Sequence, residues 1–511
     1  MAPIFNNPLP GKTNETLEYE IVPKKGVYTI NVKLPELGET QIKVMMLEET
    51  EKSSLMGMAF IHKLASENHQ AAQDISRLYS GYHQIFKTNE KKELHAAINH
   101  LLKDQQSGEL AKEAALYLKQ VLGGEPLTFS EGRRLIEGLM PSIYGTLTIP
   151  QPKKVYTEQE VRVSEMQASH YAFPDLIKFK GLYYVCFREG NAHVKFEDLG
   201  SIRILKGEYN PTAKTWAWKN DGLITHGSYD LRDPKFFTDS HDNLRMIVGG
   251  SLVGKKDRTR LHIPYVAVRE QDQWNLEEVI IDAPETIEFA DADDASEIKA
   301  RGQWIWSVTW NKDANVGYAF SYRSMSSKLS LVKTLDGKTF HKITEVSSEA
   351  LDEKSKLFDE NDARRSEFLN EATIRFKTDG TAISLIRTSR HGLIGVASPA
   401  NQHVDWSLNV VPFRLGGPNF IMTKDQSNMW AGTRHFFLNG DNSLDETTIL
   451  AYMDQKQLVP LLELKSHLDC GYPGMVVEEN GNITMVYYSS KREGETAIYI
   501  VRIEVPQVDG S

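Results

Sequence analysis

The sequence predicts a mainly β protein, a six-bladed β-propeller preceded by an N-terminal domain that is mainly helical. From about residue 170 onward, alternating apolar strands come in pairs joined by tight turns, and no long helical periodicity interrupts them. Before residue 150, apolar residues instead recur at three- and four-residue spacing. The chain has 511 residues, 40% hydrophobic and 25% charged, which is enough apolar material for a large core.

The first 150 residues divide into two segments. Residues 1–48 are predicted to be extended, because residues 27–34 alternate between apolar and polar side chains. Residues 49–150 are predicted to form a helical domain, since stretches such as KKELHAAINHLLKD and GELAKEAALYLKQVL place apolar side chains on one helix face. The proline-containing stretch TIPQPKKVYTEQE then predicts a linker. The helical domain is a candidate docking module for a protein partner.

Residues 160–507 carry the repeated hairpins. The segments LIKFKGLYYVCFR, KFFTDSHDNLRMIVGG, TIRFKTDGTAISLIR and GMVVEENGNITMVYYSS each contain two alternating runs around a Lys-Gly, Asp-Asn, Asp-Gly or Asn-Gly turn. Hairpins that recur every few dozen residues are typical of a radial array of sheets. About 340 residues, at roughly 45–60 per four-stranded blade, predict about six blades.

Charge and composition exclude several classes of protein. With 59 Lys and Arg against 69 Asp and Glu, the net charge is −10, so no nucleic-acid partner is predicted. No stretch approaches the ~20 apolar residues of a membrane-spanning helix. Cys186 and Cys470 are too few for a disulfide framework or a cysteine-based zinc site. The acidic run from Asp291 to Glu297 lacks the ligand spacing of an EF-hand loop. The sequence therefore predicts neither a metal nor a cofactor.

The beginning of the sequence bears on location. It lacks a basic segment followed by an apolar one, which is the pattern of a secretory signal peptide. We therefore expect a cytoplasmic protein. Export by a route that needs no signal peptide is the alternative.

Four polar side chains stand out in the second region. They are Glu371 in NEATIR, Arg387 at the end of AISLIR, Arg434 at the end of MWAGTR and Tyr472 in GYPG. In a propeller the inner strands of all blades converge on one central funnel, so residues distant in sequence meet there. An arginine at the end of an apolar strand is costly to leave unpaired. Two such arginines from neighbouring blades form a fork for an anionic ligand, unless each pairs with a carboxylate of the protein.

The ordered segments of the second region resemble the sialidase (neuraminidase) superfamily, in particular its bacterial sialidase-like branch. Over about residues 168–505, the matching segments are AFPDLIKFKGLYYVCFREGNAH, DLRDPKFF, WSVTW followed by GYAFSYR, NEATIRFKTDGTAISLIR, LGGPNFI followed by AGTRHF, and CGYPGMVVEENGNITMVYYSS. TLDGKTF, from Thr334 to Phe340, resembles a shortened Asp-box, the turn that recurs in sialidase blades. The resemblance implies a six-bladed propeller that acts as an exo-glycosidase on a terminal acidic sugar.

The resemblance also implies a set of roles. Sialidases are retaining glycosidases with a tyrosine nucleophile, a glutamate that activates it, an aspartate acid/base and three arginines that bind the sugar carboxylate. Because sialic acid carries a carboxylate on its anomeric carbon, a carboxylate nucleophile would be repelled, whereas a phenol is neutral until it loses its proton. A free phenol has a pKa near ~10, so a carboxylate must accept that proton. By resemblance, Tyr472 is the nucleophile, Glu371 its base, and Arg387 and Arg434 the second and third arginines.

The first arginine departs from the family pattern. Phe173-Pro174-Asp175 stands where the family has Arg-Ile-Pro. Arg188, at the far end of the same hairpin, and Arg232, in DLRD, are the candidates to supply the missing charge. The spacing does not choose between them.

The acid/base is the second departure. It belongs in the loop after the first hairpin, where Asp198 is the predicted residue, with Asp175 and Asp233 as further candidates in the funnel. His170 and His193 flank the first hairpin, and either hydrogen-bonds a sugar or satisfies a loop carbonyl.

Two functions from different classes follow. The first is a sialidase-like exo-glycosidase whose substrate is a glycan or small acidic sugar. The second is a catalytically inactive propeller that binds a glycan or a protein through the same funnel. The presence of Tyr472, Glu371, Arg387 and Arg434 together favours the enzyme, since a binding module needs no phenol paired with a carboxylate. The missing first arginine and the lack of a signal peptide favour the binding module.

Overall fold

The computed structural model describes two parts of the chain. In the first part it describes the backbone of residues 9–12, 18–24, 27–34 and 38–45. In the second it describes residues 152–505 apart from 155–157, 255–257, 283–300, 312–314, 324–325, 349–367, 389–391, 412–414, 427, 439–443, 457, 465, 467–468 and 493–494. The predicted helical domain, residues 49–150, and the acidic run from Asp291 to Glu297 lie outside the described residues.

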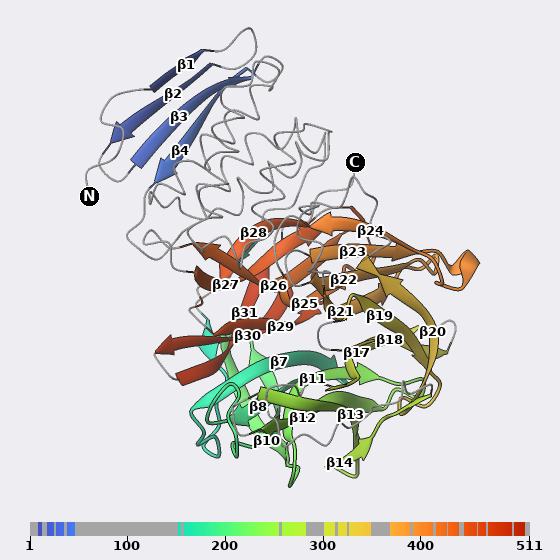
Figure 1. Ribbon diagram of the computed structural model, residues 1–511. Coiled ribbons are helices and arrows are strands. Elements are labelled where there is room, and N and C mark those ends of the chain that lie inside the picture. The colour runs from blue at the N-terminus through green and yellow to red at the C-terminus, as the bar shows by residue number, and fades with distance from the viewer. Residues whose placement is uncertain are drawn as a thin grey trace.

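The first part is a four-stranded antiparallel sheet with the strand order β1-β2-β3-β4 (Figure 1). Its strands are β1 (Leu9–Lys12), β2 (Glu18–Lys24), β3 (Val27–Leu34) and β4 (Gly38–Met45). They lie in the segment for which the sequence predicts extended structure.

The second part consists of six sheets that follow one another along the chain, and their strands are antiparallel except for two short strands that pair in parallel. Blade one consists of β7 (His170–Phe179), β8 (Leu182–Gly190), β9 (Ser201–Asn210) and β10 (Thr215–Ile224). Blade two consists of β11 (Asp230–Thr238), β12 (Leu244–Gly254), β13 (Arg258–Glu270), β14 (Gln273–Glu278) and the short β16 (Arg301–Gly302). Blade three consists of β17 (Trp304–Asn311), β18 (Val316–Tyr322), β19 (Lys328–Thr334), β20 (Thr339–Ser347) and the short β15 (Ile280–Asp282).

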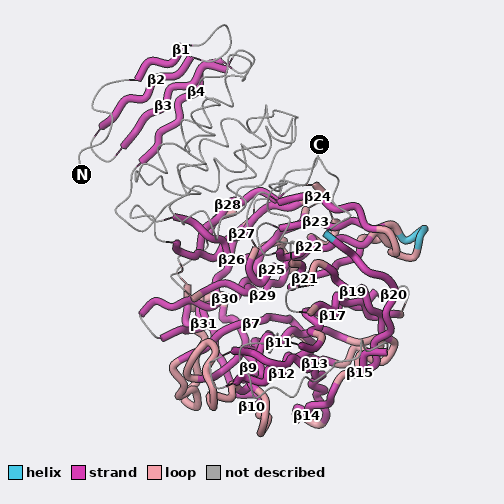
Figure 2. The backbone as a smooth tube through the Cα atoms, viewed as in Figure 1, coloured by secondary structure: helices cyan, strands magenta, loops and turns pink. Residues whose placement is uncertain are grey.

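Blades four to six complete the set. Blade four consists of β21 (Leu369–Phe376), β22 (Ala382–Thr388), β23 (Gly392–Ala397) and β24 (Trp406–Val411). Blade five consists of β25 (Gly416–Met422), β26 (Met429–Leu438), β27 (Leu444–Met453) and β28 (Leu458–Leu464). Blade six consists of β29 (Cys470–Val477), β30 (Ile483–Arg492) and β31 (Glu495–Glu504), together with β5 (Lys153–Lys154) and β6 (Gln159–Glu160). A 3₁₀ turn, η2 (Pro399–Asn401), precedes β24 and is drawn in cyan in Figure 2.

The six sheets form a closed ring. Their first strands contact one another in the order β7, β11, β17, β21, β25 and β29, and β29 contacts β7. Blade six takes its outer strands from the start of the region, since β5 and β6 both pair with β31. This pairing joins the two ends of the ring. The prediction of a mainly β, six-bladed propeller is confirmed.

The apolar core lies between neighbouring blades. One cluster, for example, combines Cys186 of blade one with Met246, Val248 and Tyr265 of blade two. Both cysteines, Cys186 and Cys470, are buried free thiols. Across the part of the chain that the structure describes, no helix is long and apolar enough to cross a lipid bilayer.

A β-bulge interrupts the first hairpin of every blade at the same place, which is what positions the site. In each case two residues of the first strand lie opposite one residue of the second. The six bulged pairs are Phe173-Pro174, Asp233-Pro234, Trp306-Ser307, Asn370-Glu371, Gly417-Pro418 and Tyr472-Pro473. A bulge redirects a side chain, and it tolerates proline because the bulged residue need not donate to the ladder.

The bulges bring side chains of distant blades together. The ring centroids of Phe173 and Tyr472 are 5.0 Å apart, and those of Trp306 and Tyr472 are 5.7 Å apart. Phe173, Asp233 and Tyr472 all have positive φ, at 58°, 50° and 52°. A positive φ is strained for residues with a side chain, and such strain gathers at functional sites. The place where these bulges meet is called the funnel below.

Candidate functional site

The funnel holds a tyrosine paired with a glutamate. Tyr472 Oη donates a hydrogen bond to Glu371 Oε1 at 2.7 Å, and both residues are buried. Arg387 Nη1 donates to the same carboxylate oxygen at 2.7 Å and to Tyr472 Oη at 2.9 Å. The other carboxylate oxygen, Oε2, accepts from the backbone N–H of Gly417 at 2.7 Å. Blades four, five and six thus supply one connected group.

The surroundings set the protonation states of this pair. Burial raises the pKa of Tyr472, and the Glu371 charge raises it further, while Arg387 and Arg434 act in the opposite direction. Burial also acts to raise the pKa of Glu371, but the charge of Arg387 and the hydrogen bonds that the carboxylate accepts outweigh it and leave that pKa below its ordinary value. The site therefore holds a neutral phenol against an ionised carboxylate, the arrangement in which the carboxylate can accept the phenolic proton.

Two further arginines, Arg434 and Arg232, lie over the rings of Tyr472 and its neighbour Phe173. The guanidinium carbon of Arg434 lies 5.4 Å from the centre of the Tyr472 ring, and that of Arg232 lies 5.1 Å from the centre of the Phe173 ring. Arg434 Nη1 donates to Glu446 at 2.8 Å, and Arg232 Nε lies 3.4 Å from Asp230 Oδ2. Arg387 therefore pairs with Glu371, whereas Arg434 pairs with Glu446 and lies 4.0 Å from Asp469.

Arg188 lies behind the funnel wall. Its side chain is fully buried, with Nε donating to Asp230 at 2.7 Å and Nη1 donating to the carbonyl of Ala192 at 2.7 Å. Of the two candidates for the missing arginine, Arg232 is therefore the one that reaches the aromatic residues of the funnel.

Two of the candidate aspartates hold the backbone. Asp198 Oδ2 accepts from the backbone N–H groups of Asn191 and Ala192, at 2.9 and 2.7 Å. Asp175 is buried and accepts from the backbone N–H of Phe236 at 2.7 Å, which links blade one to blade two. Both carboxylates make hydrogen bonds that hold the fold.

Asp233 has different surroundings. It occupies in β11 the bulge position that Tyr472 occupies in β29. Its Oδ1 atom is buried and has no hydrogen-bond partner among the described residues. Burial raises its pKa to about 6; Arg232 opposes this change and Glu371 adds to it. Unpaired buried polar atoms are rare, and one in a funnel indicates a place for a ligand.

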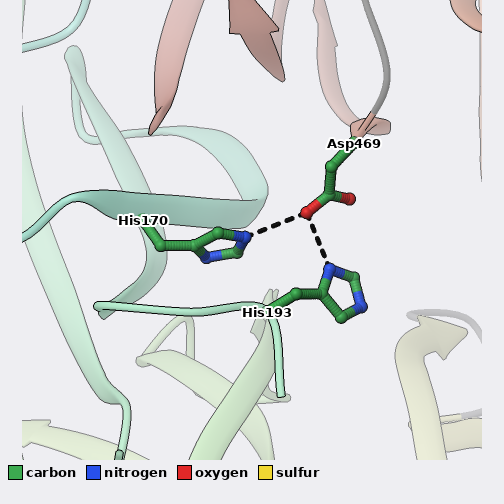
Figure 3. Close-up of side chains that lie close together, drawn as sticks. All are labelled: His170, His193 and Asp469. Carbon is green, nitrogen blue, oxygen red and sulfur yellow. Dashed lines mark hydrogen bonds and ion pairs between the residues drawn. The ribbon is translucent and has the colours of Figure 1, made fainter. Parts of the chain in front are cut away.

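A second polar cluster consists of His170, His193 and Asp469 (Figure 3), and the ring centres of His193 and Phe173 lie 5.2 Å apart. His170 Nε2 and His193 Nδ1 both bond to Asp469 Oδ2, at 2.9 and 2.7 Å. Tyr488 Oη donates to Asp469 Oδ1 at 2.6 Å. Burial acts to raise the pKa of Asp469, but the hydrogen bonds from both histidines and from Tyr488 hold that pKa well below its ordinary range.

Sequence reasoning missed three residues of this region. Asp469 follows an unremarkable polar stretch, and only the fold brings it to histidines about 300 residues away. Phe173 and Trp306 pack against Tyr472 from blades one and three. A signal was present in the sequence, since proline within an apolar strand indicates a bulge, and Phe173, Asp233, Gly417 and Tyr472 each precede one.

The chain was compared with known proteins. No protein-family model matches it, and neither does any curated protein. Among solved structures, it is similar to a protein of unknown function from Dyadobacter fermentans, at 16% identity with a TM-score of 0.51, over 70% of this chain and 100% of that chain. It is also similar to a mutant of the NanB sialidase from Streptococcus pneumoniae, at 10% identity with a TM-score of 0.44, over 72% of each chain. A third similar structure is the phage phi92 endosialidase, at 9% identity with a TM-score of 0.46, over 71% of this chain and 70% of that chain. Because the sequence identity is only 16%, the similarity to the Dyadobacter fermentans protein supports the fold and nothing further.

Proposed function

We propose that the protein is a glycoside hydrolase that removes a terminal acidic sugar, sialic acid or a related sugar, with Tyr472 as nucleophile and Glu371 as its base. The observation that carries this proposal is the 2.7 Å hydrogen bond from Tyr472 Oη to Glu371, with Arg387 Nη1 within 2.9 Å of both groups. A site that only binds has no need to pair a phenol with an ionised carboxylate.

The proposed first step transfers one proton and exchanges one bond. Tyr472 Oη attacks the anomeric carbon while its proton passes to Glu371 Oε1, and the bond to the leaving oxygen breaks as that oxygen takes a proton from an acid. Arg387 donates to Tyr472 Oη, so its charge stabilises the developing phenolate. In the second step, water gives one proton to the conjugate base of that acid and displaces the tyrosine from the anomeric carbon, while the proton held by Glu371 returns to the phenolate oxygen.

The arginines support an anionic substrate. Arg387, Arg434 and Arg232 approach Tyr472 and Phe173 from blades four, five and two. In this proposal, Arg232 takes the place of the arginine missing from the Phe173-Pro174-Asp175 segment. A charge-assisted hydrogen bond contributes about 1.5–3 kcal/mol, so each arginine is expected to affect substrate affinity strongly.

Asp233 fits the acid/base role better than Asp198. Its pKa of about 6 gives both protonation states near neutral pH, whereas Glu371, in the same funnel, has a lowered pKa. Carboxyl groups whose pKa values are pushed apart divide into acid and base. The Asp198 carboxylate is already held by two backbone N–H groups of its own loop.

A covalent trap tests the proposal. A 2,3-difluorinated sialic acid slows both steps and lets a glycosyl-tyrosine intermediate accumulate. We expect the wild-type protein to gain the mass of one sugar on the peptide that contains Tyr472, and Glu371→Gln to gain it far more slowly. No adduct, or an adduct on another residue, contradicts the proposal.

A second function is favoured by one observation. Arg387, Arg434 and Arg232 already pair with Glu371, Glu446 and Asp230. A funnel with its cations paired suits a propeller that binds a glycan or a protein without catalysis. Binding of a sialoside without turnover, and without a covalent adduct, would support this function.

A further inference from the structure

A series of polar side chains links Asp230 at the start of β11 to Arg188 and His170 of blade one, and these to Asp469, directly before β29. Arg188 donates from Nε to Asp230 at 2.7 Å, and its Nη1 lies 3.5 Å from His170 Nδ1. His170 Nε2 lies 2.9 Å from Asp469 Oδ2, and His193 Nδ1 lies 2.7 Å from the same oxygen (Figure 3). This series of side chains therefore leads from a fully buried arginine, Arg188, to His193.

The hydrogen bonds of this series determine which ring nitrogen of each histidine carries the hydrogen. An arginine can only donate, so His170 Nδ1 is the acceptor and His170 Nε2 carries the hydrogen that it donates to Asp469. Asp469 is an ionised acceptor, so His193 carries its hydrogen on Nδ1. The pKa of His193 is lowered, because partial burial of the ring and the charge of Arg232 outweigh the opposing effect of Asp469, and this favours the neutral ring at neutral pH. A neutral imidazole with its hydrogen on Nδ1 leaves the lone pair of Nε2 free to accept a hydrogen bond.

His193 is the most exposed member of this series and the one that a ligand can reach. The side chains of His170, Asp469 and His193 are 6%, 25% and 47% exposed. The His193 ring lies 5.2 Å from Phe173, which in turn lies 5.0 Å from Tyr472. Its backbone carbonyl accepts a hydrogen bond from Arg232, so both its main chain and its side chain are held.

From these contacts we infer that His193 is a ligand-binding residue of the funnel wall, held by Asp469 so that Nε2 accepts a hydrogen bond from a hydroxyl group of the bound sugar. The inference rests on the proposed function for the class of ligand. His193 is one aromatic ring away from the nucleophile, so its partner is a hydroxyl beyond the anomeric carbon. Asp469 and His170 are positioning residues, because they act through His193.

A metal ion is the competing explanation for this cluster. The three ligand atoms lie within 4.8 Å of one another, which a metal ion could bridge. Coordination by His170 Nε2, however, would put the remaining hydrogen on Nδ1, facing the donor Nη1 of Arg188. Metal-binding histidines instead donate that hydrogen to a carboxylate or a carbonyl. The cluster is therefore built as a hydrogen-bonded support.

Nitrogen-15 NMR of the histidine rings of the full-length protein at pH 7 tests the support itself. We expect His193 with its hydrogen on Nδ1 and His170 with its hydrogen on Nε2. Asp469→Asn offers an amide donor to His193, so a shift of the His193 hydrogen to Nε2 is expected in that variant. A wild-type His193 that carries its hydrogen on Nε2, or zinc titration that produces metal-bound His170 and His193 signals, overturns the inference.

Kinetics with an aryl sialoside test the contact. His193→Phe keeps a ring against Phe173 and removes the acceptor, so KM should rise roughly 3- to 10-fold with kcat within about twofold. His341→Phe is the matched control, because His341 bonds to Asp282 at 2.9 Å on the outer edge of blade three. An unchanged KM in His193→Phe, with normal wild-type turnover, overturns only this inference. A wild-type protein that neither binds nor hydrolyses the sialoside overturns the proposed function, and the sugar contact with it.

Discussion

Tyr472 Oη lies 2.7 Å from Glu371 Oε1, although 101 residues separate the two in the chain. Each residue belongs to the bulge in the first strand of its blade, and blade five lies between those two blades. The Gly417 bulge of blade five closes the arrangement, since its N–H donates to the other oxygen of Glu371. The distance is thus a property of the closed ring, and perturbing any of the three bulges should disturb the pair.

Gly417→Ala tests this dependence. Gly417 has φ 57°, and an added Cβ would lie 2.4 Å from Tyr472 Cγ. We expect turnover to fall about 100-fold, because a displacement of about 1 Å at a reacting group has effects of that size. Gly181→Ala is the control, since Gly181 has φ 83° and nothing within 4 Å of the added atom. Backbone strain should cost each variant roughly 1–2 kcal/mol of stability, and Gly417→Ala should lose more than Gly181→Ala because its added Cβ also overlaps Tyr472. Equal turnover in the two variants would contradict the account.

Asp233→Asn should stabilise the protein near neutral pH. A carboxyl whose folded pKa is raised contributes stability that is fully present below its unfolded pKa, 3.8, and is lost as the pH rises through about 6. At pH 7 this loss corresponds to at most about 3 kcal/mol, which the neutral amide avoids. Denaturant unfolding should therefore show a more stable variant at pH 7 and little difference at pH 3. An equal or lower stability at pH 7 would show that the carboxylate is not strained there.

The same substitution separates the two candidates for the acid. If Asp233 protonates the leaving oxygen, Asp233→Asn should reduce hydrolysis of alkyl sialosides far more than hydrolysis of activated aryl sialosides, which need no proton. Asp198→Asn should mainly lower the melting temperature, because the carboxylate holds backbone N–H groups of its loop. A leaving-group dependence found in Asp198→Asn alone would return the acid role to Asp198.

The third cation is tested by Arg232→Lys. The lysine keeps a charge but loses the guanidinium over Phe173, so KM for a sialoside should rise about 10-fold or more, within the range of one charge-assisted hydrogen bond. Arg203→Lys is the comparison, because Arg203 pairs with Glu189 at 2.7 Å in blade one. If the two substitutions have the same effect on KM, Arg232 does not contact the substrate.

The sequence predicted the features that depend on neighbouring residues. Alternating runs and turn residues are local, so the hairpins and the number of blades could be read directly. Asp469 could not be found in this way, because its histidine partners lie about 300 residues earlier and only ring closure brings them close. The Asp198 hydrogen bonds were hidden for a different reason. The carboxylate holds backbone N–H groups of its own loop, and a turn of this kind leaves no distinctive residue pattern.

The most direct test of the central claim is the turnover of an aryl sialoside by Tyr472→Phe. The substitution removes one oxygen, which bonds to Glu371 and Arg387, and leaves the ring against Phe173 and Trp306. Tyr488→Phe is the matched control, since it removes the same atom from a ring whose centre lies 6.1 Å from that of Tyr472.

We expect Tyr472→Phe to lose roughly three orders of magnitude in kcat or more, with an unchanged melting temperature. Tyr488→Phe should stay within about tenfold of wild type. Turnover by Tyr472→Phe at the wild-type rate would contradict the claim. So would a wild-type protein that is inert toward sialosides, other nonulosonic acids and uronides yet binds a glycan or a protein in the funnel.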